Sequence, residues 1–245
     1  MTWTYIGNLN NHVEFPQFAA FRDAADECVY IAQSGLMKYK AGALTSPAGT
    51  PANIRRLAVQ NNRLFGITGV DQTLWYSNLN DGDSLGIEAS QGGSQIIRTY
   101  GNQELTALAA VGGSLLIFHR SAISRFTGYG AGDISIASGT RGVTSDVGTV
   151  APDSIVVVEN VCYFLTDRGF YAATEDGVHA ISEKIERTIT ELDHAAYYQV
   201  QGVNNRKYRE VWWSFPATGA YVYNYRLESW SGPMVGAFER SYTSW

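Results

Sequence analysis

The sequence predicts an all-β protein, a β-propeller of about five blades with a short inserted helix. Three observations carry this prediction. Short apolar runs alternate with turns of Asn, Asp and Gly, which is typical of antiparallel meanders. The chain is rich in strand-forming aromatic residues, with 15 Tyr, 10 Phe and 6 Trp, and in turn-forming Gly, with 25. A hairpin unit also recurs along the 245 residues, which we therefore treat as a single domain.

The clearest copy of this unit spans residues 153–182. Apolar runs are separated by a polar Glu159-Asn160 turn, by residues 166–169 and by a turn at 175–177. Weaker copies cover residues 28–39, 56–79, 105–128 and 197–230. Successive units can be aligned on Val29, Leu64, Leu115, Tyr163 and Val211, and the last three steps are each about 50 residues, a period typical of propeller blades. The first step is shorter, so either the first blade is trimmed or its register differs.

The two ends of the chain admit two interpretations. The segments TWTYIG and AFERSYTSW can share one blade and close the ring, or residues 1–27 form an N-terminal arm that contacts neighbours. Residues 182–193 predict a helix of about three turns, with Ser182 as its cap and Ile185, Ile189 and Leu192 on one face, inserted between two blades. A weaker helical pattern covers residues 16–27. The Gly- and Ser-rich segments 41–53 and 128–148 predict long loops.

Composition excludes several classes of protein. The net charge of −5 gives no general reason to bind nucleic acid, and the one basic cluster, residues 206–209, has the pattern of a solvated hairpin tip. The N-terminus lacks a signal-peptide pattern, and no apolar run is long enough to span a membrane. Cys28 and Cys162 lie in apolar runs, which predicts two buried thiols rather than a disulfide framework.

No motif predicts an enzyme, a cofactor site or a metal site. The four His (His12, His119, His179 and His194) form no zinc-ligand pattern, and the acidic segment 78–83 lacks the closing Glu of a helical calcium loop, which favours a polar turn. A glycoside hydrolase needs a carboxylate pair, yet nothing marks a pair among Asp133, Asp146, Asp153, Glu159, Asp167 and Glu175. The aromatic residues Trp212, Trp213, Tyr221, Tyr223, Tyr225 and Trp230 form either a sugar-stacking platform or, as alternating strands favour, core.

Four segments in order resemble a group of tailed-bacteriophage virion proteins with a β-propeller body. They are residues 56–79, 105–126, 148–185 and 221–230, and the third, with YFLTDRGFY and ISEKI, is the most specific. The resemblance implies a structural tail protein similar to the nozzle or hub of short-tailed phages. Such a protein is made in the host cytoplasm, resides in the virion tail and contacts other tail proteins.

The same resemblance implies a homo-oligomeric ring, with a hexamer favoured, around the channel through which DNA is ejected. Nozzle proteins are usually much larger than this chain, which leaves room for a smaller adaptor or fibre-docking protein. The alternative from a different class is a propeller that binds or cleaves glycans on the host cell surface.

Overall fold

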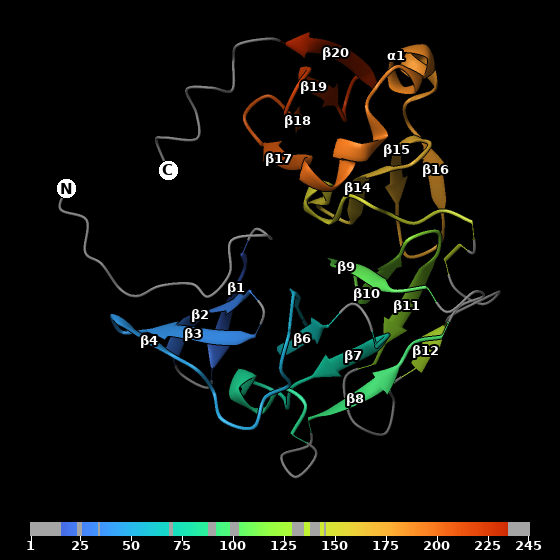
Figure 1. The fold of residues 1–245 in the computed structure, drawn as a ribbon. Coiled ribbons are helices and arrows are strands. Elements are labelled where there is room, and N and C mark those ends of the chain that lie inside the picture. The colour runs from blue at the N-terminus through green and yellow to red at the C-terminus, as the bar shows by residue number, and fades with distance from the viewer. Residues whose placement is uncertain are drawn as a thin grey trace.

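The structure is a computed structural model, and it describes residues 16–23, 26–33, 35–68, 71–87, 92–98, 103–128, 135–137, 143–144 and 146–234. Within these ranges the strands form five four-stranded antiparallel sheets. The sheets follow one another around a common centre like the blades of a propeller (Figure 1). The predicted all-β fold of about five blades is therefore confirmed.

Each blade consists of four consecutive strands. The first comprises β1 (Gln17–Asp23), β2 (Asp26–Ala32), β3 (Leu36–Lys40) and β4 (Ala43–Thr45). The second comprises β5 (Arg56–Gln60), β6 (Arg63–Ile67), β7 (Thr73–Tyr76) and β8 (Gly93–Ile96). The third comprises β9 (Leu105–Val111), β10 (Ser114–His119), β11 (Ile123–Thr127) and β12 (Ser135–Ala137). The fourth comprises β13 (Val156–Val158), β14 (Val161–Thr166), β15 (Gly169–Ala173) and β16 (Val178–Ala180). The fifth comprises β17 (Gln201–Asn205), β18 (Glu210–Phe215), β19 (Gly219–Asn224) and β20 (Ser229–Met234).

Strands pair in chain order within every blade, and the first strand lies toward the centre of the ring (Figure 1). The five alignment residues of the repeat, Val29, Leu64, Leu115, Tyr163 and Val211, all lie in the second strand of their blades. The alignment of the repeat therefore matches equivalent strands in all five blades. The first blade has four strands like the others, so it is not trimmed.

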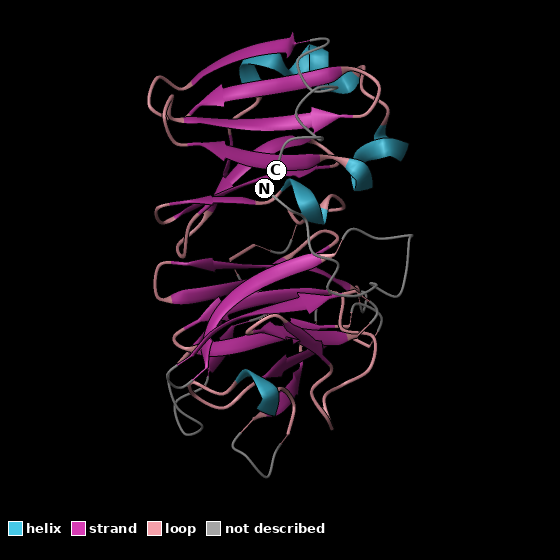
Figure 2. Ribbon diagram, turned by 90° about the vertical axis from the view of Figure 1, so that its left-hand side faces the viewer, coloured by secondary structure: helices cyan, strands magenta, loops and turns pink. Residues whose placement is uncertain are grey.

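The strands run between the two ends of the ring, so the connections gather there (Figure 2). One end holds the turns that join the first strand to the second and the third strand to the fourth. We call it the hairpin end. The opposite end, with the turns between second and third strands and the connections between blades, is the crossover end. Tight turns at the hairpin end are sharp enough to need positive φ angles, as at Asn61 (50°), Asn62 (57°) and Glu159 (55°).

Four hydrophobic clusters join consecutive blades. Tyr30 and Leu64 belong to the first, and Phe65 and Leu115 to the second. The third contains Phe118 and Phe164, with ring centroids 5.0 Å apart in an edge-to-face arrangement. The fourth contains Phe170 and Trp213, whose centroids are 4.4 Å apart. Each blade covers one face of its neighbour, which is how small sheets bury their apolar surface in a propeller.

The predicted helix at residues 182–193 is shorter than expected. It consists of a 3₁₀ turn, η5 (Glu183–Ile185), and a single-turn helix, α1 (Glu186–Thr190), followed by η6 (His194–Gln199). Ser182 does not cap it, because its hydroxyl accepts a hydrogen bond from the Phe170 amide of β15 (3.0 Å). Ile189 and Leu192 are nevertheless buried in the cluster between the fourth and fifth blades.

The helix expected at residues 16–27 was wrong, because Gln17–Asp23 and the residues from Asp26 onward form strands. Gln17–Asp23 is the innermost strand of the first blade, and its Ala19 and Phe21 are buried with a strand period of two. Pairing with β2 across seven residues outweighed a helical spacing of Phe residues. The rest of the expected N-terminal arm, residues 1–15, and the closing segment 237–245 lie outside the described residues.

Two segments expected as loops contain strands. Ala43–Thr45 forms the outermost strand of the first blade, and Ser135–Ala137 that of the third. Much of the remainder of 128–148 lies outside the described residues. η1 (Gly82–Ser84) lies in the connection between β7 and β8, and η4 (Pro152–Ser154) precedes the fourth blade.

Candidate interaction surfaces

The outer face of the first blade is apolar and lies away from the second blade. Cross-strand pairing places Phe18, Ile31 and Met37 in one row of this face. A second row contains Val29, Tyr39 and Leu44. None of these residues belongs to the cluster that joins the first two blades, and Phe18 is 60% exposed. A sheet face of this composition is normally covered by another element.

The outer face of the fifth blade is apolar in the same way. Val203, Trp212 and Val222 are cross-strand neighbours there, and Val203 is 52% exposed. Met234 at the edge of the sheet is also exposed. Among the residues that the structure describes, none of the four inter-blade clusters contains members of both the first and the fifth blade. We refer to these two surfaces as the outer faces.

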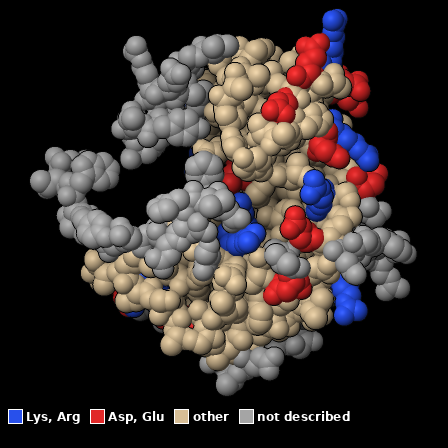
Figure 3. Space-filling view, viewed as in Figure 1, with Lys and Arg blue, Asp and Glu red and all other residues tan. Residues whose placement is uncertain are grey.

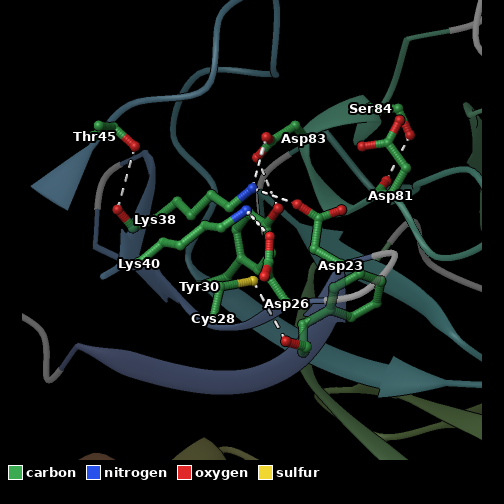
Figure 4. Close-up of polar contacts among 11 residues, drawn as sticks. Asp23, Asp26, Cys28, Tyr30, Lys38, Lys40, Thr45, Asp81, Asp83 and Ser84 are labelled. Atoms are coloured by element: carbon green, nitrogen blue, oxygen red, sulfur yellow. Dashed lines mark hydrogen bonds and ion pairs between the residues drawn. The ribbon is translucent and has the colours of Figure 1, made fainter. Parts of the chain in front are cut away.

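A partly buried polar cluster joins the first blade to the second at the hairpin end (Figure 4). The ammonium group of Lys38, whose side chain is 8% exposed, contacts Asp23 at 2.6 Å and Asp83 at 2.7 Å. The Tyr30 hydroxyl donates to the second oxygen of Asp83 (2.7 Å), and the Lys38 nitrogen lies 5.4 Å from the centre of the Tyr30 ring. Three segments that are distant in the sequence therefore meet at one cation.

We call this cluster of Lys38, Asp23, Asp83 and Tyr30 the clamp. The protonation states of its groups suit a structural role. Burial alone would lower the pKa of Lys38, but hydrogen bonds from its ammonium group to Asp23 and Asp83 outweigh burial and raise it. Burial and the neighbouring Asp83 raise the pKa of Tyr30, and burial raises that of the Cys28 thiol. A charged amine, a neutral phenol and a neutral thiol offer no activated nucleophile or base at neutral pH.

The acidic segment 78–83 therefore has a function that its composition did not reveal. Asp83 was expected to lie in a plain polar turn, and its carboxylate also accepts hydrogen bonds from Tyr30 and Lys38 of the first blade. Within the described ranges, no group of three or more His, Cys, Asp or Glu side chains is arranged to hold a metal ion. The signal available in the sequence was the Lys at a core-facing position of β3, where a cation needs an anionic partner.

A second ion pair crosses the ring at the crossover end. The Arg56 guanidinium, at the start of β5, contacts Asp153 of η4 at 3.0 Å. The two residues are 97 positions apart and link the second blade to the fourth, bypassing the third. Both side chains are largely buried, which favours a rigid centre over an open catalytic site.

The other candidate carboxylates are spread over both ends of the ring. Glu159 and Glu175 lie in turns at the hairpin end, whereas Asp167 lies in a turn at the crossover end. Glu175 accepts a hydrogen bond from the Gly113 amide (2.6 Å), and Asp146 accepts one from Thr144 (2.6 Å). Asp133 lies outside the described residues. Glu175 and Asp146 are thus engaged in hydrogen bonds within the chain, as Asp153 is with Arg56.

Most of the candidate sugar-stacking aromatics are core residues. Trp213, Tyr221 and Tyr223 are buried in the cluster between the fourth and fifth blades, and Trp230 and Tyr225 pack against it. The Trp213 indole donates to the Ser154 carbonyl of η4 (2.8 Å), which joins the fifth blade to the connection before the fourth. Trp212 alternates to the opposite side of β18, on the outer face.

Both cysteines are free and buried, as predicted. Burial raises the pKa of the Cys162 thiol far above its usual range, so this group stays protonated. No helix in the described part of the chain is long and apolar enough to cross a membrane. The face of the ring seen in Figure 3 mixes Lys and Arg with Asp and Glu, without a broad area of one sign.

No protein-family model matches the sequence, and no curated protein matches it either. Solved structures do match. One is the extracellular domain of a hybrid two-component system from B. thetaiotaomicron, with a TM-score of 0.56 and 14% identity over 94% of this chain and 29% of that one. Another is PorZ, a surface component of the type-IX secretion system of Porphyromonas gingivalis, with a TM-score of 0.51, 14% identity, and coverage of 87% and 33%.

A third match is the AfRom2 CNH domain, with a TM-score of 0.51 and 10% identity over 84% of this chain and 67% of that one. The chain spans about a third or less of the length of the two bacterial proteins. At such identities the similarity shows the fold alone.

Proposed function

We propose that the chain is a structural component of a bacteriophage tail, similar to a nozzle, hub or adaptor. It acts through protein–protein contacts in a symmetric ring around the DNA exit channel and resides in the virion. The observation that carries this proposal is the pair of apolar outer faces at the two ends of the blade series. The resemblance of four sequence segments to phage propeller proteins names the assembly in which such contacts would be made.

The outer faces suggest how copies would join. The face around Phe18 and the face around Val203 consist of different residues, so a contact between them is heterologous. A heterologous contact that closes on itself generates a ring, which is the symmetry expected of a tail component. Each large apolar side chain transferred from water into such a contact contributes about 1.5–3 kcal/mol.

Passage of DNA is compatible with the charge of the chain. Tight binding to a duplex requires Lys and Arg side chains that neutralise phosphates. This chain carries a net charge of −5, and the Arg56 guanidinium near the centre of the ring is already paired with Asp153. An assembly of such subunits would let DNA slide rather than hold it.

Analytical ultracentrifugation over a range of concentrations tests the assembly. We expect the wild-type chain to sediment as a closed oligomer that electron microscopy shows as rings. The double variant Phe18→Ser/Val203→Ser should shift the equilibrium to the monomer. Leu227→Ser is the matched control, because Leu227 is 70% exposed but lies in the turn after β19, off both outer faces. A wild-type chain that remains monomeric throughout would contradict the proposal.

The second candidate function is binding of host-surface glycans, and one cavity favours it. A cavity of about 360 Å³ at the crossover end is lined by Tyr198, His194, Glu104 and Arg120, among others. Tyr198 is 59% exposed, and an exposed aromatic ring beside polar groups is a common arrangement for stacking on a sugar. Glu104 is the one carboxylate in this lining, which favours binding over cleavage by a carboxylate pair.

Titration with host polysaccharide distinguishes the two functions. Glycan binding by a monomeric chain, lost in Tyr198→Ala and retained in Phe18→Ser, would favour the second candidate. Assembly without glycan binding would favour the first.

A further inference from the structure

A second cavity, of about 740 Å³, lies between the fourth and fifth blades at the hairpin end. Its volume is in the range of small-ligand sites. The lining comes from the β13–β14 hairpin, the end of β17, the turn before β18 and the turn after β19. The residues are Val157, Val158, Glu159, Asn204, Arg206, Arg209, Tyr225 and Arg226.

Three guanidinium groups line this cavity without internal partners. Arg206 and Arg209 come from the turn between β17 and β18, and Arg226 comes from the turn between β19 and β20. In the described part of the chain, none of the three side chains donates a hydrogen bond or forms an ion pair. All three side chains are exposed, so a ligand from solution can reach them.

The charges around the cavity favour a dianion. Three positive guanidinium groups and the one negative carboxylate of Glu159 give the lining a net charge of two positives in a chain whose overall charge is −5. Cations held near one another repel, and an anion between them relieves this repulsion. The planar guanidinium donates two parallel hydrogen bonds, a geometry that matches the oxygens of phosphate and sulfate groups.

The neutral residues of the cavity suit the same ligand. The Tyr225 ring stacks on Tyr163, with centroids 6.3 Å apart, and this contact holds the ring in place. Asn204 has a side-chain oxygen that is buried without a hydrogen-bond partner. Because an amide exchanges its oxygen and nitrogen by rotation about one bond, Asn204 can present its NH₂ group to an anion.

We propose that this cavity binds a small divalent oxyanion, a phosphate or sulfate group, through Arg206, Arg209 and Arg226. The cluster at residues 206–209 looks like an ordinary hairpin tip in the sequence. In the folded chain this cluster lies beside Arg226 from a separate turn. The neighbouring blade supplies the opposite wall of the cavity. The site is independent of the outer faces, so it can be tested on any assembly state.

Isothermal titration calorimetry with inorganic phosphate and with sodium sulfate, at constant ionic strength set with chloride, tests the proposal. The wild-type chain should bind both anions. Arg209→Gln/Arg226→Gln should weaken binding at least about tenfold for each guanidinium removed. Glu159→Gln, which removes the only negative charge of the lining, should tighten binding.

Arg168→Gln is the matched control, because it removes one exposed arginine at the opposite end of the ring and should leave binding unchanged. All substituted side chains are exposed, and thermal unfolding monitored by circular dichroism confirms that the variants fold. The proposal is overturned if neither anion binds, or if Arg168→Gln weakens binding as much as the double variant. A single-stranded oligonucleotide that binds where inorganic phosphate and sulfate do not would overturn it in favour of a nucleic-acid site.

Discussion

The buried His119 makes the stability of this protein depend on pH. Its ring is fully buried at the end of β10, with Nε2 3.0 Å from the Ser124 hydroxyl and Nδ1 3.5 Å from the Gln103 carbonyl oxygen. Burial lowers the pKa of His119 from 6.5 to about 4, and the hydrogen bond to Gln103 opposes this only in part. The folded protein therefore holds the imidazole neutral at pH values where the unfolded chain protonates it.

The sign and size of the effect follow from this difference. Between about pH 6.5 and pH 4 the unfolded state binds one more proton than the folded state, so the free energy of unfolding falls as the pH falls. The slope is about 1.4 kcal/mol per pH unit, and the whole window amounts to about 3 kcal/mol. Above about pH 6.5 both states are neutral at this position, and the stabilisation is complete.

Urea unfolding followed by tryptophan fluorescence, at several pH values from about 7.5 to about 5, measures this slope. His119→Gln keeps a polar group near Ser124 but removes the titration, so its stability should depend less steeply on pH than that of the wild type. His179→Gln, a change at an exposed position, should retain the wild-type slope. If the wild type and His119→Gln lose stability in parallel over this range, the reasoning is refuted.

Two further substitutions test the contacts between blades, again by urea unfolding. Lys38→Met leaves two carboxylates without their buried cation and should lower the free energy of unfolding by about 3 kcal/mol. Lys40→Met, at an exposed ion pair, should leave the free energy of unfolding nearly unchanged. Similar losses in both variants would contradict the structural role of the clamp. Gly202→Ala places a methyl group 2.5 Å from the Ser154 carbonyl oxygen and should cost about 1–3 kcal/mol, while Gly177→Ala meets nothing within 4 Å. Equal stability of these two alanine variants would show that β17 does not pack closely on the fourth blade.

The clamp and the Arg56–Asp153 ion pair together hold the outer face of the first blade in a fixed position. The ion pair of Lys38 with Asp83 joins the first blade to the second blade. The ion pair of Arg56 with Asp153 joins the second blade to η4, which precedes the fourth blade. The outer face of the first blade is thus held on a body that includes most of the ring. A rigid presentation of this kind lowers the conformational cost of a contact with another molecule.

Much of the fold could be predicted from local patterns. The second strand of each blade was recognised because a run of apolar residues between Asn, Asp or Gly turns specifies a buried strand without further context. The burial of Cys162 and Trp213 followed from the same alternation. Residues 16–27 were misassigned because Phe and Ala at these spacings satisfy a helical face and a strand face equally, and only pairing with β2 decides between them.

The candidate sites depended on contacts that no local pattern encodes. Lys38 meets Asp83 across 45 residues, and Arg56 meets Asp153 across 97. Arg226 joins Arg206 and Arg209 only because the turns at one end of a blade lie side by side. Local sequence patterns were sufficient for the second strand of each blade and for the repeat, but not for β1, β4 and β12, because alternation and turn chemistry act over only a few residues. Which charges pair, which exposed arginines line a cavity and which apolar residues stay exposed on the outer faces depend on the tertiary structure, because the arrangement of blades around a common centre brings distant residues together.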